Sequence, residues 1–502
     1  MNSDLIKQYS EEYVDYLRDE SRTVGHADYI AFPKTEEEVI EVVKYCYDNN
    51  IQITSQGSRT GVAAGAVPYK GLALNFSKMN QLVSKREEGG EVYLTFQPGA
   101  MLMDIRTFVH DNYPAYFFPP DPTETSAAIG GMVNCNSSGA LSFMYGPTRN
   151  HVTRLTYILS DGRKVDIKRG QYFAKGLEAK IPCTDGSALE FTLPSYTMPN
   201  TKNVAGYFVK PDMDLFDLTI GCDGTLAILT SVEIKLQKLP KYIAGAICMF
   251  ETEDQAFDFV IKYRYSKKGI AALEYFDSHG IELLRYNKAN VSGFEDIFDI
   301  PEHINAVIYT EIHAMDDDHY EDLVMNLSDY FMEAGGREDD VFIAEGAKEI
   351  QTMKDFRHAM PESSNMQVDL VRKLHPEVTK MGGDMSVPDE YLMEAGHMFR
   401  DTIKEWGFKS ATWAHIGQSH IHANIIAQDE NEYARAHELF KEWARWVSAH
   451  HGSVSAEHGI GKMKNDFLMI MYGQDGINQM RNLKKVFDTK YLLNVGNLFS
   501  KE

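Results

Sequence analysis

Three histidines lie within one eight-residue segment, H-I-G-Q-S-H-I-H, which runs from His415 to His422. A glutamate and a fourth histidine, Glu457 and His458, follow in the segment A-E-H-G-I-G. Imidazoles together with a carboxylate are usual ligands of a catalytic divalent metal, with one position left open for substrate. These residues therefore predict either a metal site or a metal-free cluster of hydrogen-bonded histidines.

The spacing of the histidines limits which of them can share a site. In one regular strand His420 and His422 point to the same face, whereas His415 and His422, seven residues apart, point to opposite faces. His415 and His422 can converge only if the chain turns or bulges at 417–419. His420 is then an added ligand, a hydrogen-bond donor to a ligand, or a surface residue.

His458 lies in a loop that Gly459 and Gly461 make pliable. An imidazole with a pKa near its ordinary value of ~6.5 suits the removal of a hydroxyl proton. His458 could therefore be a general base, and the alternative is that it only orients the neighbouring Glu457.

Segments rich in small residues are the other candidates for a binding function. They are the loop 56–61 (Q-G-S-R-T-G), the stretch 119–152 and the turn 221–226. Backbone N–H groups of such loops can bind the two phosphates of a dinucleotide without side-chain charge. The first loop follows a helix and a strand and precedes another strand, and G-x-G-x-x-G is absent from the chain. A Rossmann site needs strand, glycine loop and helix in that order, so a nicotinamide-binding Rossmann domain is a poor fit.

The hydrophobic pattern predicts an α+β protein that positions these segments. Thr35 and Glu38 have the spacing of a capping box, and the residues up to Cys46 repeat as in an amphipathic helix. Strands are expected at 51–54, 71–76, 93–100 and 221–236, with a hairpin around 161–162. After Pro240, strands at 242–250, 269–276 and 304–312 alternate with helices at 254–264 and 319–333, which indicates helices on an antiparallel sheet.

Composition excludes several classes of protein. Among the 502 residues, 50 basic and 73 acidic side chains give a net charge of −23, which argues against nucleic acid or an anionic membrane surface as the main partner. We find no apolar run of about 18 residues, as a transmembrane helix needs. The five cysteines lack the spacing of an iron–sulfur ligand set. The acidic N-terminus does not resemble a signal peptide, so we expect a cytoplasmic protein, at most peripheral to a membrane through a partner.

Six segments occur along the chain in a fixed order. They are Q-G-S-R-T-G from Gln56, P-P-D-P…I-G-G…Y-G-x-T-R from Pro119, G-x-D-G-T-L from Gly221, H-x-G-x-x-x-x-H from His415, E-H-G-I-G from Glu457 and L-N-x-G from Leu493. In this order they resemble one family, the FAD-linked D-2-hydroxy-acid dehydrogenases of the vanillyl-alcohol-oxidase (PCMH) type. This family includes D-lactate dehydrogenases, the flavin subunit of glycolate oxidase and D-2-hydroxyglutarate dehydrogenase.

The resemblance implies three parts of the chain. They are a PCMH-type FAD-binding domain of two α+β subdomains at 1–240, an α+β cap domain for substrate and metal at 241–445, and a C-terminal segment at 446–502 that returns to the flavin. FAD is expected to be non-covalent, because the segments 56–61 and 119–149 contain no histidine and Cys135 is expected to be buried filler. The residues implied to bind it are Gln56, Gly57, Ser58, Arg59, Thr60, Gly61, Pro120, Asp121, Thr125, Gly130, Gly131, Asn136, Gly139, Gly224, Thr225, Ile228 and Asn494.

The resemblance also implies a reaction, the oxidation of a D-2-hydroxy acid such as D-lactate or glycolate to the 2-oxo acid, with hydride passing to flavin N5. His415, His422 and Glu457 are implied to hold a divalent metal, zinc or alternatively manganese or iron. His458 is implied to be the catalytic base. Arg357 and Asn424 are implied to bind the substrate.

The electrons need a separate acceptor, because the chain has no iron–sulfur ligand set. A quinone, an electron-transfer flavoprotein or an iron–sulfur subunit would serve. This chain has Gly382 where the family has a lysine near the substrate, which argues against 2-hydroxyglutarate. The rival hypothesis is a non-catalytic or differently reacting flavin or metal subunit of a larger redox complex.

Overall fold

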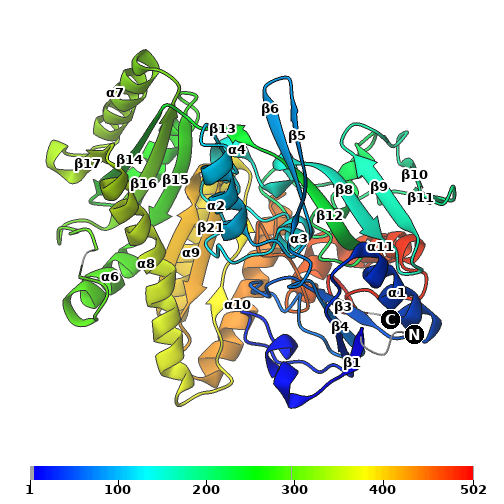
Figure 1. The fold of residues 1–502 in the computed structure, drawn as a ribbon. Helices are drawn as coiled ribbons and strands as arrows, with labels where there is room; N and C mark the ends of the chain where they lie inside the picture. The colour runs from blue at the N-terminus through cyan, green and yellow to red at the C-terminus, as the bar shows by residue number, and fades with distance from the viewer. Residues whose placement is uncertain (1–4, 296, 501–502) are drawn as a thin grey trace.

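The computed structural model describes residues 5–295 and 297–500 and has mixed α+β architecture. Sheets of the first 240 residues lie on one side of the molecule, and a large sheet of the following residues lies on the other (Figure 1). The end of the chain crosses back to the first side and lies beside α1 (Glu36–Asp48). The predicted fold class is confirmed.

Two sheets form most of the first part. One has the order β1-β2-β4-β3, in which β2, β4 and β3 are parallel: β1 (Ile6–Gln8), β2 (Tyr29–Ala31), β3 (Ile53–Gln56) and β4 (Leu72–Asn75). The other is antiparallel with the order β5-β6-β12-β8-β9: β5 (Leu82–Glu88), β6 (Glu91–Phe96), β8 (Val152–Ile158), β9 (Lys164–Lys168) and β12 (Ile228–Lys235). Two small antiparallel pairs complete this part: β7 (Tyr116–Phe117) with β13 (Gln237–Lys238), and β10 (Glu178–Pro182) with β11 (Ala188–Thr192).

Local sequence explains α1 directly. The Thr35 hydroxyl accepts the backbone N–H of Glu38, and Val39, Val43 and Cys46 are buried against the first sheet. The amphipathic helix is confirmed, whereas only half of the predicted capping box forms, because the Glu38 carboxylate accepts the backbone N–H of Lys34 and not that of Thr35.

The sequence of the stretch 119–152 has no hydrophobic period and indicated no helix, yet the structure has short helices there. Gly130 in α3 (Ile129–Cys135) lies so close to Pro98 that an added Cβ would be 2.7 Å from the proline Cβ. Close backbone contact at Gly130 thus adds to ordinary side-chain packing, since Ile129, Met132 and Val133 of α3 are buried in the core. The other helices of this part are α2 (Leu102–Asn112) and α4 (Ser142–Tyr145).

An eight-stranded antiparallel sheet forms the second part. Its order is β17-β14-β16-β15-β20-β21-β18, and β19 also pairs with β21: β14 (Tyr242–Phe250), β15 (Ile270–Phe276), β16 (Ala306–Ala314), β17 (Val341–Ala344), β18 (Met381–Gly382), β19 (Met385–Ser386), β20 (Ser410–His415) and β21 (His420–Ile425). The helices around it are α5 (Glu253–Tyr263), α6 (Ser278–Asn290), α7 (Asp317–Glu333), α8 (Ala347–Arg372) and α9 (Leu392–Trp406).

Helices cover both faces of this sheet, which explains why its strands are almost continuously apolar. On β14, Ile247 and Met249 pack in one hydrophobic cluster with residues of α6 and α8. Cys248 and Phe250 on the other face pack with residues of α5, α7 and α9. The latter cluster continues into the first part of the chain, so one core extends across Pro240.

The C-terminal part consists of α10 (Glu430–Ala449), a loop that carries Glu457 and His458, and α11 (Asn465–Phe487), which is interrupted at Gly473 (φ 64°). The chain then returns to the first sheet, where Ile53 of β3 pairs with Leu493. In the described part of the chain, no helix has both the length and the apolar character to cross a membrane.

Candidate functional site

The β20–β21 hairpin brings the three histidines of 415–422 together. His415 ends β20 and is opposite His420, the first residue of β21, while His422 is opposite Trp413. The turn between the strands is one short 3-10 turn closed by Ser419 in the left-handed region (φ 51°). The turn that the sequence required at 417–419 is therefore present, and the histidines lie on two strands instead of one.

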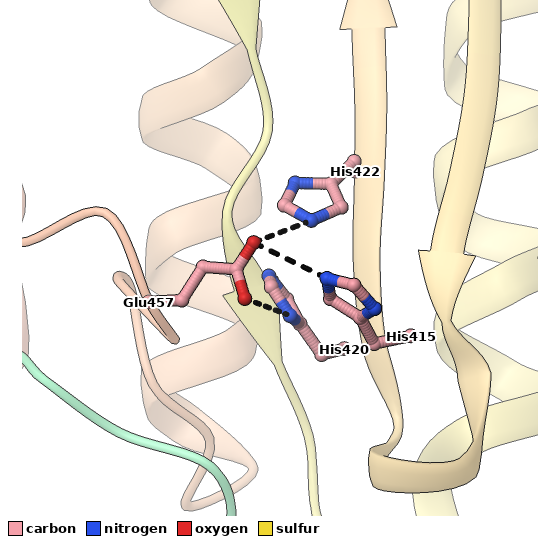
Figure 2. A group of neighbouring side chains, drawn as sticks. All are labelled: His415, His420, His422 and Glu457. Atoms are coloured by element: carbon pink, nitrogen blue, oxygen red, sulfur yellow. Dashed lines mark hydrogen bonds and ion pairs between the residues drawn. The ribbon is translucent and has the colours of Figure 1, made fainter. Parts of the chain in front are cut away.

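Glu457 lies at the centre of the three imidazoles (Figure 2). Its Oε1 is 3.3 Å from His415 Nε2 and 3.2 Å from His422 Nε2. Its Oε2 accepts hydrogen bonds from Lys202 Nζ at 2.6 Å and from Ser138 Oγ at 3.0 Å. The two oxygens thus face different partners, and only Oε1 faces both His415 and His422.

The outer nitrogen of each imidazole is engaged on the side away from Glu457. His415 Nδ1 donates to a carboxylate oxygen of Glu274 at 2.7 Å, and His422 Nδ1 donates to the carbonyl of Gly383 at 2.8 Å. His420 Nε2 is 3.1 Å from an oxygen of Asp384. Such outer hydrogen bonds fix the ring orientation of metal-binding histidines. The donor set fits a divalent metal, and the ligand atoms of His415, His420, His422 and Glu457 all lie within 4.8 Å of one another.

His420 differs from the other two histidines in what its inner nitrogen contacts. Its Nδ1 is 3.2 Å from Lys202 Nζ and 3.9 Å from Glu457 Oε2. His420 therefore lies on the side of the carboxylate that the lysine ammonium neutralises.

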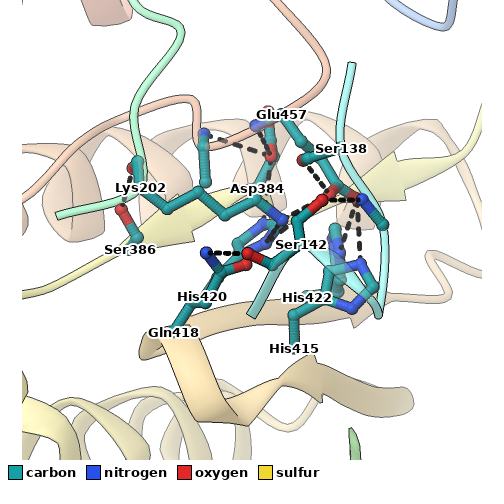
Figure 3. A network of polar contacts seen from close by, with 12 residues as sticks. Ser138, Ser142, Lys202, Asp384, Ser386, His415, Gln418, His420, His422 and Glu457 are labelled. Carbon is teal, nitrogen blue, oxygen red and sulfur yellow. Dashed lines mark hydrogen bonds and ion pairs between the residues drawn. The ribbon is translucent and has the colours of Figure 1, made fainter. Parts of the chain in front are cut away.

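Asp384 organises the loop of Glu457 and His458 (Figure 3). Its side chain, which is 1 % exposed, accepts the backbone N–H groups of residues 456, 457 and 458 and an ammonium hydrogen of Lys464. Burial acts to raise the Asp384 pKa, but the nearby His458, Lys464 and His420 hold it well below its usual value. Sequence reasoning missed Asp384, Lys202 and Glu274. Asp384 directly precedes the segment M-S-V-P, but no motif or spacing in the sequence links it to Glu457.

Electrostatics separate the histidines of the site. Burial opposes the charged form of His415, but Glu274 and Glu457 outweigh it and raise the His415 pKa to about 9. Burial lowers the His458 pKa to about 4 against the opposing effect of Asp384, so this imidazole is neutral near pH 7. His458 stacks on His422 with ring centroids 5.2 Å apart.

A cavity of about 310 Å³ is lined by His415, Glu457 and His458 together with residues of the small-residue segments. Most of the residues implied to bind FAD line it: Gln56, Gly57, Ser58, Arg59, Thr60, Gly61, Gly130, Gly131, Gly139, Gly224 and Asn494. A Cβ added at Gly61 or Gly131 would meet no atom within 4 Å, so both glycines present bare backbone to the cavity. This cradle suits a large ligand that approaches the backbone closely.

Six of the implied residues lie elsewhere: Pro120, Asp121, Thr125, Asn136, Thr225 and Ile228. Asn136 accepts the backbone N–H of Arg149, and Thr225 donates to the carbonyl of Cys222. The Pro120 carbonyl accepts a hydrogen bond from Arg106, and Ile228 is buried in the core of the first sheet. These contacts shape the segments that line the cavity, and Asp121 and Thr125 line a second cavity instead.

The second cavity, of about 450 Å³, contains Arg357 of α8. Arg357 is 3.7 Å from Glu274, which in turn binds His415. Asn424 is buried on β21 and donates to the carbonyls of His422 and Ala411, and it does not line either cavity. The structure thus brings Arg357 toward the histidine cluster and leaves Asn424 behind it.

Comparison with protein families shows to which family this chain belongs. Residues 27–168 match the FAD binding domain, and residues 239–498 match the C-terminal domain of FAD linked oxidases. The chain belongs to the FAD-linked oxidase family. The first match covers the loops 56–61 and 119–152, and the second covers the hairpin and Glu457, so most of the cradle belongs to an FAD-binding domain.

The names of several relatives of this FAD-linked oxidase refer to small hydroxy acids. It is 26 % identical to glycolate oxidase subunit GlcD of Bacillus subtilis over 95 % of this chain and 89 % of that protein. It is 25 % identical to a D-lactate dehydrogenase of Anaerostipes hadrus over 96 % and 92 % of the two chains. It is 24 % identical to a D-2-hydroxyglutarate dehydrogenase of Stutzerimonas stutzeri over 94 % and 90 %.

A solved structure has the same fold. An alkyldihydroxyacetonephosphate synthase matches with a TM-score of 0.64 at 14 % sequence identity, over 98 % of this chain and 82 % of that chain. At this identity the likeness concerns the fold alone.

Proposed function

We propose that this FAD-linked oxidase oxidises a D-2-hydroxy acid to the 2-oxo acid and passes the electrons to a separate acceptor. The observation that carries the proposal is that His415, Glu457 and His458 line the same cavity as the segments proposed to bind FAD. A proton acceptor and a candidate metal site thus adjoin the cradle of the cofactor. The names of the relatives support the choice of substrate class.

Two bound groups would complete the site. FAD, held non-covalently by the segments around Gly57, Gly131 and Gly224, would accept the hydride from the substrate carbon. A divalent metal on His415, His422 and Glu457, with zinc proposed first and manganese or iron as alternatives, would polarise the hydroxyl and bind a carboxylate oxygen.

The chain's own residues supply the proton chemistry. Burial lowers the His458 pKa below the ordinary value expected from the sequence, so the imidazole is neutral but a weaker base than expected. Its free lone pair can accept the hydroxyl proton while the C2 hydrogen leaves with its electron pair. The C–O bond of the substrate then becomes the carbonyl of the 2-oxo acid. Arg357 would pair with the substrate carboxylate through its planar guanidinium. Asn424 is proposed to act from behind His422, because its amide donates to the His422 carbonyl.

A metal-free version of the site is the second candidate. Lys202 places an ammonium 2.6 Å from Glu457 Oε2, so part of the negative charge is already neutralised by the protein. In that version the histidines and Lys202 only position Glu457. A chelator then leaves turnover unchanged, whereas the metal-dependent version loses turnover with its flavin still bound.

We also propose the domain division 1–240, 241–445 and 446–502. The limit between 445 and 446 falls inside α10, so a limit after this helix agrees better with the elements. The spacing of the five cysteines in the sequence does not suit an iron–sulfur ligand set, so we propose an external electron acceptor such as a quinone, an electron-transfer flavoprotein or an iron–sulfur subunit.

Turnover with a dye acceptor tests the function. The purified protein should be yellow, acid should release its FAD, and D-2-hydroxy acids should reduce the dye while their L-enantiomers should not. A yellow protein that reduces dye with none of these acids would favour the rival role of a non-catalytic flavin subunit. A colourless protein that FAD cannot reconstitute would contradict the cofactor proposal.

A further inference from the structure

The second cavity lies between the two large parts of the molecule. Residues 106, 109 and 110 of α2 and residues 351, 354, 357 and 358 of α8 line it. Both sets repeat at helical spacing, so each helix turns one face to the cavity. Pro122 and Thr123 line this cavity and the first one, which makes the two cavities neighbours.

Two ion pairs at this cavity are close, whereas the ion pair of Arg357 is longer. Arg106 is 2.9 Å from Asp121, and Lys354 is 3.0 Å from Glu311. Arg357 is 9 % exposed at its side chain, yet its nearest carboxylate, Glu274, is 3.7 Å away.

The guanidinium of Arg357 therefore has donors to spare. The hydrogen bond that the structure gives it goes to Nε2 of His358 at 3.0 Å. Burial and the nearby Arg357 lower the pKa of His358, which keeps this imidazole a neutral acceptor. A guanidinium has five N–H donors, and a buried cation needs an anion. One carboxylate would satisfy this site, and a second would have to displace an existing ion pair.

The remaining wall of the cavity has an apolar part beside polar residues such as Thr123, Thr125 and Gln351. The apolar part is formed by side chains from α2, β7 and the residue after it, the segment before α4, and β14: Val109, Phe117, Phe118, Leu141 and Ile243. A two- or three-carbon acid would leave most of the 450 Å³ unfilled and this wall uncovered.

We propose that this cavity is the side-chain chamber of the substrate, and that the enzyme takes 2-hydroxy monocarboxylic acids with a bulky, uncharged side chain, branched or aromatic. The inference rests on the proposed function. Arg357 holds the one carboxylate, and Glu274 connects Arg357 to His415. The substrate side chain lies against the apolar wall, and C2 faces the junction with the first cavity.

A panel of acids tests the substrate class in the holoenzyme with a dye acceptor. The panel contains glycolate, D-lactate, D-2-hydroxyisocaproate, D-3-phenyllactate and D-2-hydroxyglutarate. Each methylene buried against the wall should raise kcat/KM about fourfold, which corresponds to ~0.8 kcal/mol. D-2-hydroxyisocaproate and D-3-phenyllactate should therefore exceed D-lactate by more than tenfold, and D-2-hydroxyglutarate should be a poor substrate.

A substitution in the wall tests the location of the chamber. Ile243→Trp places a larger side chain in the cavity and should lower kcat/KM for D-3-phenyllactate at least tenfold more than for glycolate. Ile261→Trp, at an exposed position on α5 of the same part of the chain, is the matched control and should leave both values within twofold.

The results separate this inference from the function beneath it. If glycolate or D-lactate is oxidised at least as well as the bulky acids, the proposed oxidation of 2-hydroxy acids is supported. The assignment of the second cavity to a bulky substrate side chain is then wrong. If Ile243→Trp lowers all the acids equally while the unfolding temperature is unchanged, the substrate class holds and the location is wrong. If no acid of either enantiomer reduces the dye, the proposed function fails and the inference falls with it.

Discussion

His458 shows how one residue combines chemistry with position. Its backbone N–H is bound by Asp384, its ring stacks on His422, and burial lowers its pKa to about 4. The same loop carries Glu457, so the proposed base and a proposed metal ligand are neighbours in the chain as well as in space. The first prediction concerns this imidazole.

His458→Asn should slow flavin reduction by D-2-hydroxy acid by ~10²-fold or more, the usual contribution of a general base. The amide keeps a similar size and polarity, so FAD content and the affinity for the 2-oxo acid product should be unchanged. Stopped-flow reduction measures the rate, and flavin absorbance measures the content. Reduction at close to the wild-type rate would move the base to another residue.

The contacts of His420 lead to a second prediction about the metal. His422→Ala should abolish binding of one divalent ion per chain, because His422 Nε2 faces the same oxygen of Glu457 as His415 does. His420→Ala should weaken binding by less than tenfold, because its Nδ1 faces Lys202. Elemental analysis after dialysis and a competing-chelator titration measure both. Equal loss in the two variants would make His420 a ligand.

His151 gives a prediction about stability and pH. It is buried beside the carbonyl of Tyr145, and burial lowers its pKa to about 4 in the folded protein against ~6.5 unfolded. Above pH 6.5 His151 is neutral in the folded and in the unfolded protein, so its contribution to the unfolding free energy does not change with pH. As the pH falls from 6.5 toward 4, only the unfolded state takes the proton, so stability falls by up to about 1.4 kcal/mol per pH unit.

His151→Gln should therefore flatten the loss of unfolding free energy between pH 6.5 and 4, measured by urea denaturation. His26→Gln, at an exposed position, is the control and should keep the wild-type slope. An unchanged slope in His151→Gln would mean that His151 is already charged in the folded protein.

At the scale of elements, the β20–β21 hairpin and α3 do most to form the site. The hairpin sets three imidazoles around Glu457, and α3 presents the backbone of Gly131 to the first cavity. The sequence spacing alone left His415 and His422 on opposite faces of a strand, and the short turn at 416–418 removed that conflict.

Gly131→Leu tests α3 as part of the FAD cradle. The new side chain projects into open cavity, and leucine favours a helix over glycine, so the apoprotein should be at least as stable as wild type. FAD affinity should fall at least tenfold, because the side chain occupies space that the cofactor needs. Calorimetry of the apoprotein and fluorescence titration with FAD measure the two effects. Wild-type FAD affinity would exclude this face of α3 from the cofactor site.

At the scale of the whole molecule, the C-terminal part connects the two large parts. Glu457 comes from this part, whereas His415 and His422 come from the eight-stranded sheet, and the chain end pairs with β3. A metal on these ligands would bind only the assembled molecule, because the ligands are distant in the unfolded chain.

Removal of metal by a chelator should therefore abolish turnover with FAD retained, and it should also lower the unfolding temperature. Return of a divalent ion at about 100 times its dissociation constant should add about 2.7 kcal/mol to the unfolding free energy. Differential scanning calorimetry at several ion concentrations measures this shift. An unfolding temperature that does not depend on the ion would support the metal-free version of the site.

The sequence by itself determined the family, the α+β class, the main strands and helices, and the loops at 56–61 and 221–226. These are local properties, since capping residues, hydrophobic periods and small-residue loops lie within short segments. The role of each site residue, His458 included, stays a prediction that the experiments above test.

Only the tertiary structure decided which groups surround these residues. Lys202, Glu274 and Asp384 come from three different parts of the chain, and no periodicity links them to Glu457. The second cavity likewise forms where α2 and α8 meet, although neither helix carries a motif. Contacts between segments far apart in the chain depend on how the sheets and helices pack, so a single sequence without its fold could not reveal them.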